Sequence, residues 1–240
     1  MNPVQNRYPT YLSDQREFFD ALITEDWETY KSDEWDHMRR FEVARLLELT
    51  SPRTILDVGC GCGFHDVAFA QPDFVARVDA IDYSPKSIER AQISYPHPKV
   101  KRWVADLREL PAETQYDLVA SFQVIEHLDA PEDHLAMCAR ECRPGGAVAI
   151  ATPNLNRLHN LVRLATLHPR ILVDPQHFRE YSASDIERMA RPFGLQRIGL
   201  FGYGFNGLDF VDHWPYEKRC MAGYRYPQVA NVFCIVLRKS

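Results

Sequence analysis

One stretch of the sequence constrains the fold most: an apolar run that ends in three closely spaced glycines. Leu56-Asp57-Val58 leads directly into Gly59-Cys60-Gly61-Cys62-Gly63, and apolar residues at helical spacing follow over 64–70. Glycines in such a place let the backbone turn sharply and let a ligand approach within contact distance. The stretch therefore predicts a strand, a tight ligand-binding turn and a helix, in that order.

The chain continues this alternation. Strand-like runs at 54–58, 75–81, 100–104, 116–122 and 147–151 alternate with helix-like segments at 85–93 and 131–142, and a turn is expected at 143–146. Such spacing predicts parallel strands joined by helical crossovers. A helix at 183–191 precedes two further strands, 195–201 and 229–237, with no helix expected between them, which favours an antiparallel last strand. The expected fold class is α/β, a Rossmann-like seven-stranded mostly parallel sheet with helices on both faces.

Composition limits the classes of function. The chain has 240 residues, 45% of them apolar, and 28 basic against 33 acidic residues, a formal net charge of −5. This balance argues against nucleic-acid or anionic-membrane binding through bulk positive charge, although a local basic patch remains compatible with it. No apolar run reaches the roughly 20 residues of a membrane span, and the N-terminus does not resemble a signal peptide. We expect a single-core cytoplasmic protein.

Three further regions are expected around this sheet. Residues 1–50 show aromatic and aliphatic residues at helical spacing, among them Trp27, Tyr30, Trp35 and Met38, and are expected to form a helical lid. Residues 51–240 then form the main domain. Two segments within it, 153–181 and 203–228, are expected to line a substrate pocket, and the second is rich in aromatic residues.

Two carboxylates follow strands at the ligand-binding edge of the expected sheet. Asp82 ends the second strand, where an acid can accept both hydroxyls of a ribose. Asp106 lies just past the third strand, where it could accept an adenine amino group. A capping role for Asp82 is the alternative. Three strand ends are thus predicted to contact one nucleoside.

These motifs, in this order, resemble the class I S-adenosylmethionine-dependent methyltransferases. The resemblance rests on the glycine loop, Asp82, Ala105-Asp106-Leu107, Tyr116-Asp117-Leu118-Val119 and Arg143-Pro144-Gly145-Gly146. It implies S-adenosylmethionine as cofactor, with Tyr83 against the adenine face. In the N-terminal helical region, Arg40 or Arg45 could pair with the cofactor carboxylate or simply be solvated. The cofactor-binding residues that it implies are Asp57, Gly59, Gly61, Gly63, Asp82, Tyr83, Asp106, Leu107 and Gln123.

The segment after the fourth strand resembles a second signature. Gln123-Val124-Ile125-Glu126-His127 is similar to the Glu-x-x-Glu-His motif of metal-dependent O-methyltransferases, such as those of ubiquinone biosynthesis and of small-RNA 3′ ends. The resemblance implies a divalent metal, Mg²⁺ or Mn²⁺, held by Gln123, Glu126, His127 and His177. Gln123 departs from the motif, and an amide in place of a carboxylate should lower metal affinity. In a helical turn, Gln123, Glu126 and His127 would share one face.

The leading hypothesis is O-methylation of a small molecule, with Glu126 and His127 as catalytic residues and His127 as base or substrate orienter. The aromatic residues of 203–228 would suit an aromatic substrate, although loop packing or a homodimer interface would explain them equally. A purely structural Glu126-His127 pair is the alternative to catalysis. Other candidates are RNA 2′-O-methylation, which the acidic charge disfavours, N-methylation and cofactor binding without turnover. Phe64, at the third-glycine position of a dinucleotide loop, disfavours a nicotinamide-dependent dehydrogenase.

Overall fold

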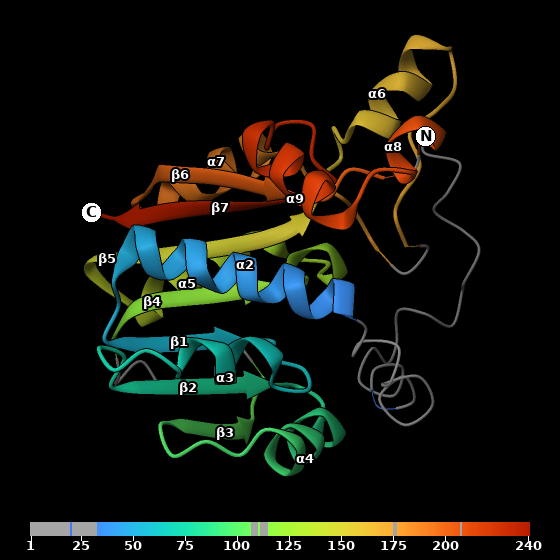
Figure 1. The fold of residues 1–240 in the computed structure, drawn as a ribbon. Coiled ribbons are helices and arrows are strands. Elements are labelled where there is room, and N and C mark those ends of the chain that lie inside the picture. Colours follow the sequence, from blue (N-terminus) through green and yellow to red (C-terminus); the bar gives the residue numbers. More distant parts are fainter. Residues whose placement is uncertain (1–19, 21–32, 107–109, 111–114, 175–176, 207) are drawn as a thin grey trace.

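One seven-stranded sheet organises the molecule in the computed structural model, which describes residue 20 and residues 33–106, 110, 115–174, 177–206 and 208–240. Its strand order is β3-β2-β1-β4-β5-β7-β6 (Figure 1). The strands are β1 (Thr54–Val58), β2 (Arg77–Asp82), β3 (Val100–Val104), β4 (Tyr116–Phe122), β5 (Cys142–Pro153), β6 (Leu195–Tyr203) and β7 (Val232–Lys239).

Helices precede and join these strands. They are α2 (Asp33–Thr50), α3 (Phe64–Phe69), α4 (Pro85–Ser94), α5 (Pro131–Glu141), α6 (Leu158–Ala165), α7 (Ala183–Ala190), α8 (Asp209–Asp212) and α9 (Tyr216–Arg225), with 3₁₀ turns at Ile125–His127 and Arg191–Phe193. Residues 33–50 of the expected lid are thus helical, whereas Trp27 and Tyr30 lie outside the described residues.

Strand directions confirm the predicted fold class. The pairs β1–β2, β1–β4, β2–β3 and β4–β5 are parallel, and β7 runs antiparallel to both β5 and β6. Because consecutive parallel strands need a crossover, the carboxyl ends of β1, β2, β3, β4 and β5 meet at one edge of the sheet. The glycine loop, Asp82 and the residues after β4 therefore come together there.

Apolar side chains cover the sheet on both faces, as a mostly parallel sheet requires. On one face Val43 and Leu46 of α2 and Phe69 of α3 pack on strand residues such as Leu118. The other face is covered by α5 and α7, whose buried residues include Leu135 and Ile186. No described helix combines the length and the hydropathy that a membrane crossing requires.

The structure corrects two local predictions. The expected loop over 203–228 contains α8 and α9, so a helix does lie between the last two strands, contrary to the expectation from which the antiparallel strand was inferred. Helix α9 packs so closely on β6 that a Cβ on Gly223 would lie 2.5 Å from Tyr203 Cα. The turn predicted at 143–146 is an irregularity within β5, because the pairing with β4 jumps from Tyr116–Cys142 to Leu118–Ala147.

Candidate functional site

A cavity of about 1250 Å³ opens at the carboxyl edge of the sheet. The glycine loop, the ends of β2 and β4 and helix α2 contribute to its wall. Both segments that were expected to form a pocket also line it, 153–181 through Arg157 and His177 among others, and 203–228 through Tyr203 and Tyr216 among others. The predicted cofactor, catalytic and substrate regions therefore share one cavity.

The glycine loop has a backbone conformation that only glycine adopts easily. Gly59 and Gly61 have φ of 73° and 53°, values that L side chains rarely adopt. The amides of Gly59 and Cys60 both donate to the Ile81 carbonyl, at 2.8 and 2.9 Å, which ties the loop to β2. A Cβ on Gly59 would lie only 2.4 Å from Val124 Cγ2. Both glycines line the cavity, so the loop presents bare backbone to a ligand.

Oxygen acceptors continue along the cavity from the end of β2. Asp82 accepts hydrogen bonds from the amides of Gly61 and Ser84, both at 2.8 Å. Burial raises the pKa of this carboxyl, while the two amides work in the opposite direction. Tyr83 is 44% exposed and lies at the cavity with Asp106, which follows β3. This arrangement suits a ligand that offers hydroxyl or amino donors and a flat ring.

Two of the predicted cofactor residues, Asp57 before the glycine loop and Gly63 at its end, do not line the cavity. Asp57 is fully buried, and among the described residues neither of its carboxylate oxygens has a hydrogen-bond partner. Burial, reinforced by neighbouring carboxylates, raises its pKa well above the usual range. Gly63 has φ 84° and supports packing, since a Cβ there would lie 2.9 Å from Ala91 Cβ. Leu107 lies outside the described residues.

Glu126, His127 and His177 form a cluster at the same cavity, with potential ligand atoms that all lie within 4.8 Å of one another. Thr152 donates to Glu126 Oε2 at 2.9 Å, whereas the buried Oε1 has no hydrogen-bond partner among the described residues. Burial raises the pKa of Glu126 to about 7, although nearby His177 favours its ionised form. His177 Nδ1 lies 3.3 Å from Glu180, which leaves Nε2 as its potential ligand atom.

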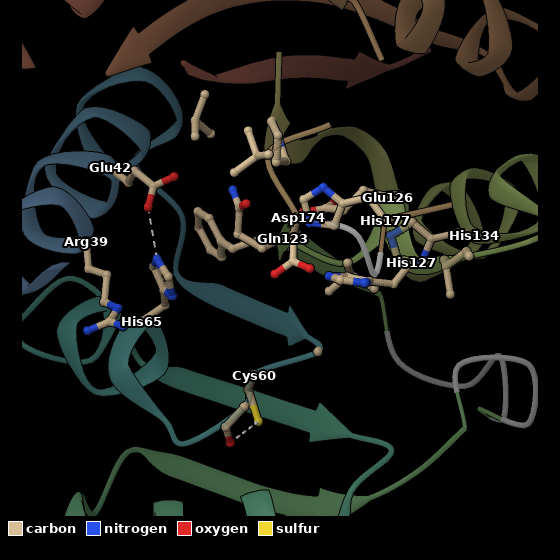
Figure 2. Close-up of a pocket in the computed structure, with 18 of the residues that line it drawn as sticks. Arg39, Glu42, Cys60, His65, Gln123, Glu126, His127, His134, Asp174 and His177 are labelled. Carbon is tan, nitrogen blue, oxygen red and sulfur yellow. Dashed lines mark hydrogen bonds and ion pairs between the residues drawn. The ribbon is translucent and has the colours of Figure 1, made fainter. Parts of the chain in front are cut away.

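Main-chain contacts bring these cluster residues together from distant parts of the chain. The Glu126 carbonyl accepts from the amide of Phe178 at 2.9 Å, which fixes the 177–180 segment against the turn after β4. Glu180 is buried and forms an ion pair with Arg157. In Figure 2, His127, His177, Glu126 and Asp174 gather on one side of the cavity. Asp174 is a carboxylate that no motif indicated.

Gln123 does not share a helical face with the cluster as expected. The 3₁₀ turn spans only Ile125–His127, and Gln123 precedes it with φ 56°, a left-handed conformation. Gln123 is among the residues that line the cavity, but its amide Nε2 is buried and has no hydrogen-bond partner among the described residues. The left-handed backbone at Gln123, and not helical periodicity, therefore determines where its side chain points.

The arginine that α2 places at the cavity is neither Arg40 nor Arg45. Arg40 and Arg45 pair with acidic residues of their own helix, and Arg45 also lies over the Tyr224 ring. Arg39 is instead the arginine of α2 that lines the cavity, with its guanidinium 3.8 Å from the centre of the Phe64 ring. Arg39 shares a helical face with Val43 and Leu46, and only the burial of that face in the structure distinguishes it from Arg40.

A buried polar network that no sequence motif indicated lies on this wall of the cavity. The Glu42 carboxylate accepts from the Tyr203 hydroxyl at 2.5 Å and contacts His65 Nε2 at 3.0 Å. The His65 ring stacks on Phe122, with centroids 3.8 Å apart. Figure 2 shows Glu42, His65 and Arg39 on the side of the cavity away from the Glu126 cluster. The network fixes α2 to β6 and to the first turn of α3.

Comparison with known proteins shows which family the chain belongs to. Residues 35–198 match the methyltransferase domain family. A Bordetella avium ubiquinone biosynthesis O-methyltransferase is 31% identical over 170 residues, which cover 66% of this chain and 68% of the relative. A Mycolicibacterium smegmatis protein named as a probable S-adenosylmethionine-dependent methyltransferase is 31% identical over 71% of this chain, but the match covers only 65% of that protein.

Solved structures agree on the fold. Magnesium protoporphyrin IX methyltransferase from Synechocystis, solved with bound SAH, superposes with a TM-score of 0.66 at 16% identity, covering 94% of this chain and 98% of that one. The N-methyltransferase NodS from Bradyrhizobium japonicum gives 0.64 at 14% identity, with coverage of 93% and 97%. With the family match over most of the sheet, the glycine loop and the strand order identify the chain as a member of the class I S-adenosylmethionine-dependent methyltransferases.

Proposed function

We propose that this chain transfers the methyl group of S-adenosylmethionine to a hydroxyl oxygen of a small molecule, with the aid of a divalent metal. The observation that supports this is the Glu126–His127–His177 cluster, which shares one cavity with the glycine loop and Asp82. Methyl transfer is an in-line displacement, so the main task of the protein is to align donor and acceptor. One cavity that holds both a donor site and a group able to handle the acceptor's proton meets that requirement.

The donor would lie along the glycine loop. Asp82 would accept from the ribose hydroxyls, Tyr83 would cover the adenine, and Asp106 would accept from its amino group. Arg39 would bind the carboxylate of the methionyl end, because it is the arginine of α2 that lines the cavity near the loop. Asp57 is buried behind the loop, and a cationic donor bound nearby would favour its ionised form.

The residues of the cluster fit a divalent metal. Glu126 Oε1 is buried without a hydrogen-bond partner among the described residues, which is costly unless a ligand completes the site. A carboxylate on the far nitrogen of His177 is the arrangement that usually orients a metal-binding histidine. One carboxylate and two imidazoles suit Mn²⁺, Zn²⁺ or Fe²⁺ at least as well as Mg²⁺. Gln123 and Asp174, at the same cavity, are further oxygen donors within the proposal.

A bound divalent cation would lower the pKa of a hydroxyl that it coordinates. The chain's own residues would do the rest: Thr152 holds one oxygen of Glu126, and Glu180 orients His177. His127 is half-buried at the cavity and would orient the acceptor. Without a metal, His127 would instead accept the acceptor's proton as a general base.

Calorimetric titration of MnCl₂ into chelator-treated protein saturated with S-adenosylhomocysteine tests the proposal. We expect saturable binding that becomes more than about tenfold weaker in His177→Ala, as loss of a metal-site residue should cause. His168→Ala is the matched control, because His168 is an exposed histidine of the same segment and should leave binding unchanged. Absence of saturable binding in the wild type would exclude the metal, and equal binding by both variants would exclude it from this cluster.

The same experiment directs the substrate search. Saturable binding would favour acceptors with two adjacent oxygens, such as catechols and vicinal diols, because these can chelate a cation. Absence of binding would favour isolated hydroxyls, carboxylates and amines, with His127 as base.

A further inference from the structure

The segment between β5 and α7 carries a projection that methyl transfer leaves unexplained. We call residues 157–173, which comprise α6 and the chain that returns from it, the α6 hairpin. Its two ends line the cavity through Arg157, His159 and Val173, among others. Its middle, residues 162–169, projects away from the sheet beyond the carboxyl edge (Figure 1). The hairpin thus joins the mouth of the active-site cavity to an exposed tip.

Hydrogen bonds between its two arms give the α6 hairpin a defined conformation. Asn160 is fully buried and makes reciprocal hydrogen bonds with Ile171, each of 3.1 Å, across the two arms. Arg163 Nε donates to the Pro169 carbonyl at 2.8 Å and closes the tip. These polar contacts therefore fix the conformation in which the tip is exposed.

The apex of the hairpin is a leucine in an unfavourable position. Leu167 is 95% exposed and has φ 60°. The His168 amide donates to the Arg163 carbonyl at 2.8 Å, and the Leu167 amide donates to the Leu164 carbonyl at 3.1 Å. These two bonds form a Schellman helix end, in which the left-handed position that Leu167 occupies normally carries glycine. Neither backbone preference nor burial accounts for a leucine here.

The surroundings of Leu167 combine apolar and basic character. Val162 and Leu164 are 39% and 42% exposed beside it. Arg163 and the exposed His168 are the basic residues of the tip, whereas Arg170, just beyond it, is half-buried and donates to Asn156. The sequence has no acidic residue from 142 to 173. This local basic character is opposite in sign to the net charge of −5 of the whole chain.

We propose that the tip of the α6 hairpin docks on an acidic lipid surface. Interfacial segments insert apolar side chains at the boundary of headgroups and acyl chains, while cations beside them attract anionic lipids. A second copy of the chain fits less well, because a symmetric contact through this patch would bring like charges together. The docked tip would bring the cavity mouth close to the lipid. This goes beyond the proposed O-methylation and does not depend on it.

Vesicle co-sedimentation of the full chain tests the proposal. We expect binding to vesicles of phosphatidylcholine mixed with phosphatidylglycerol, weaker binding to phosphatidylcholine alone, and loss of binding as salt rises. Leu167→Gly should weaken binding by about tenfold, the loss expected when one leucine no longer enters an apolar phase. It should not unfold the chain, because glycine suits the left-handed position.

Ile93→Ser is the matched control, since Ile93 is 69% exposed on α4 and should not affect vesicle binding. Equal binding to both kinds of vesicle, or unchanged binding by Leu167→Gly, would overturn the proposal. It would also be overturned if the wild type bound no vesicles but self-associated in a Leu167-dependent way, an outcome that would assign the tip to a second copy.

Discussion

Replacing Asp57 by asparagine should stabilise the ligand-free protein. The carboxylate is fully buried without a hydrogen-bond partner among the described residues, and burial raises its pKa. A buried polar group without partners costs about 1–3 kcal/mol, and more when charged. Asn keeps the shape and removes the charge, so we expect the free energy of unfolding to rise by about 2 kcal/mol at pH 8. For a chain of this size that corresponds to a Tm increase of about 4–8 °C.

The sign of the pH dependence follows from the raised pKa. The folded chain holds the Asp57 proton more tightly than the unfolded chain does, so the wild type loses stability as pH rises above the ordinary carboxyl pKa. The advantage of Asp57→Asn should therefore be small in acid and grow as pH rises. Urea unfolding at several pH values measures this difference directly.

Asp66→Asn is the matched control, because Asp66 is equally buried but fully paired. Arg102 Nε and one of its terminal nitrogens each donate to Asp66 at 2.7 Å, within the core. Breaking this pair leaves a buried guanidinium without its carboxylate, which should cost about 3–5 kcal/mol. The two substitutions, nine positions apart, should thus change stability in opposite directions.

Ligand binding completes the test of Asp57. We expect Asp57→Asn to weaken S-adenosylmethionine binding by about tenfold, because asparagine cannot take the ionised form that a cationic donor would favour. If Asp57→Asn were less stable than the wild type without ligand, the carboxylate would have to be satisfied in the free protein, and the reasoning would be wrong.

Three further predictions concern separate parts of the site, one of them with a matched control. Gly59→Ala should weaken S-adenosylhomocysteine binding by about tenfold or more, because φ 73° and a Cβ 2.4 Å from Val124 Cγ2 would distort the loop, whereas circular dichroism should stay unchanged. Arg39→Gln should weaken the same binding in calorimetry, and Arg40→Gln, on an exposed face, should not. Burial lowers the pKa of His134 to about 4, so the fold loses about 3 kcal/mol as pH falls from 6.5 to 4. His134→Gln should flatten that part of the stability profile, and an unchanged profile would mean that His134 is hydrated.

The sequence was sufficient to predict the sheet because its strands and loops carry strong local signals. Continuous apolar runs such as 116–122 and the glycines at 59–63 have few alternative conformations, and strand alternation then determines the parallel order. The same signals placed Asp82 and Glu126 at one edge of the sheet. The prediction that His177 would join Glu126 and His127 came from family resemblance, and the structure brings the three together.

Other features depend on contacts between distant segments and could not be predicted from local sequence patterns. Glu42, His65 and Tyr203 come from three elements, and only tertiary packing brings them into hydrogen-bond distance. Helix α9 was missed because its sequence is polar and contains Gly223, whose role as a contact with β6 is visible only in the fold. Arg39 was missed because choosing among neighbouring arginines requires knowing which face of α2 is turned toward the cavity.

Anomalous diffraction from crystals of the protein with S-adenosylhomocysteine and Mn²⁺ tests the central claim most directly. The account predicts a single strong manganese peak bounded by Glu126, His127 and His177, with the ribose of the ligand at Asp82 in the same cavity. A ligand bound at Asp82 with no manganese peak at the cluster would contradict metal-assisted O-methylation while leaving the donor site intact. A ligand bound elsewhere would contradict the site as a whole.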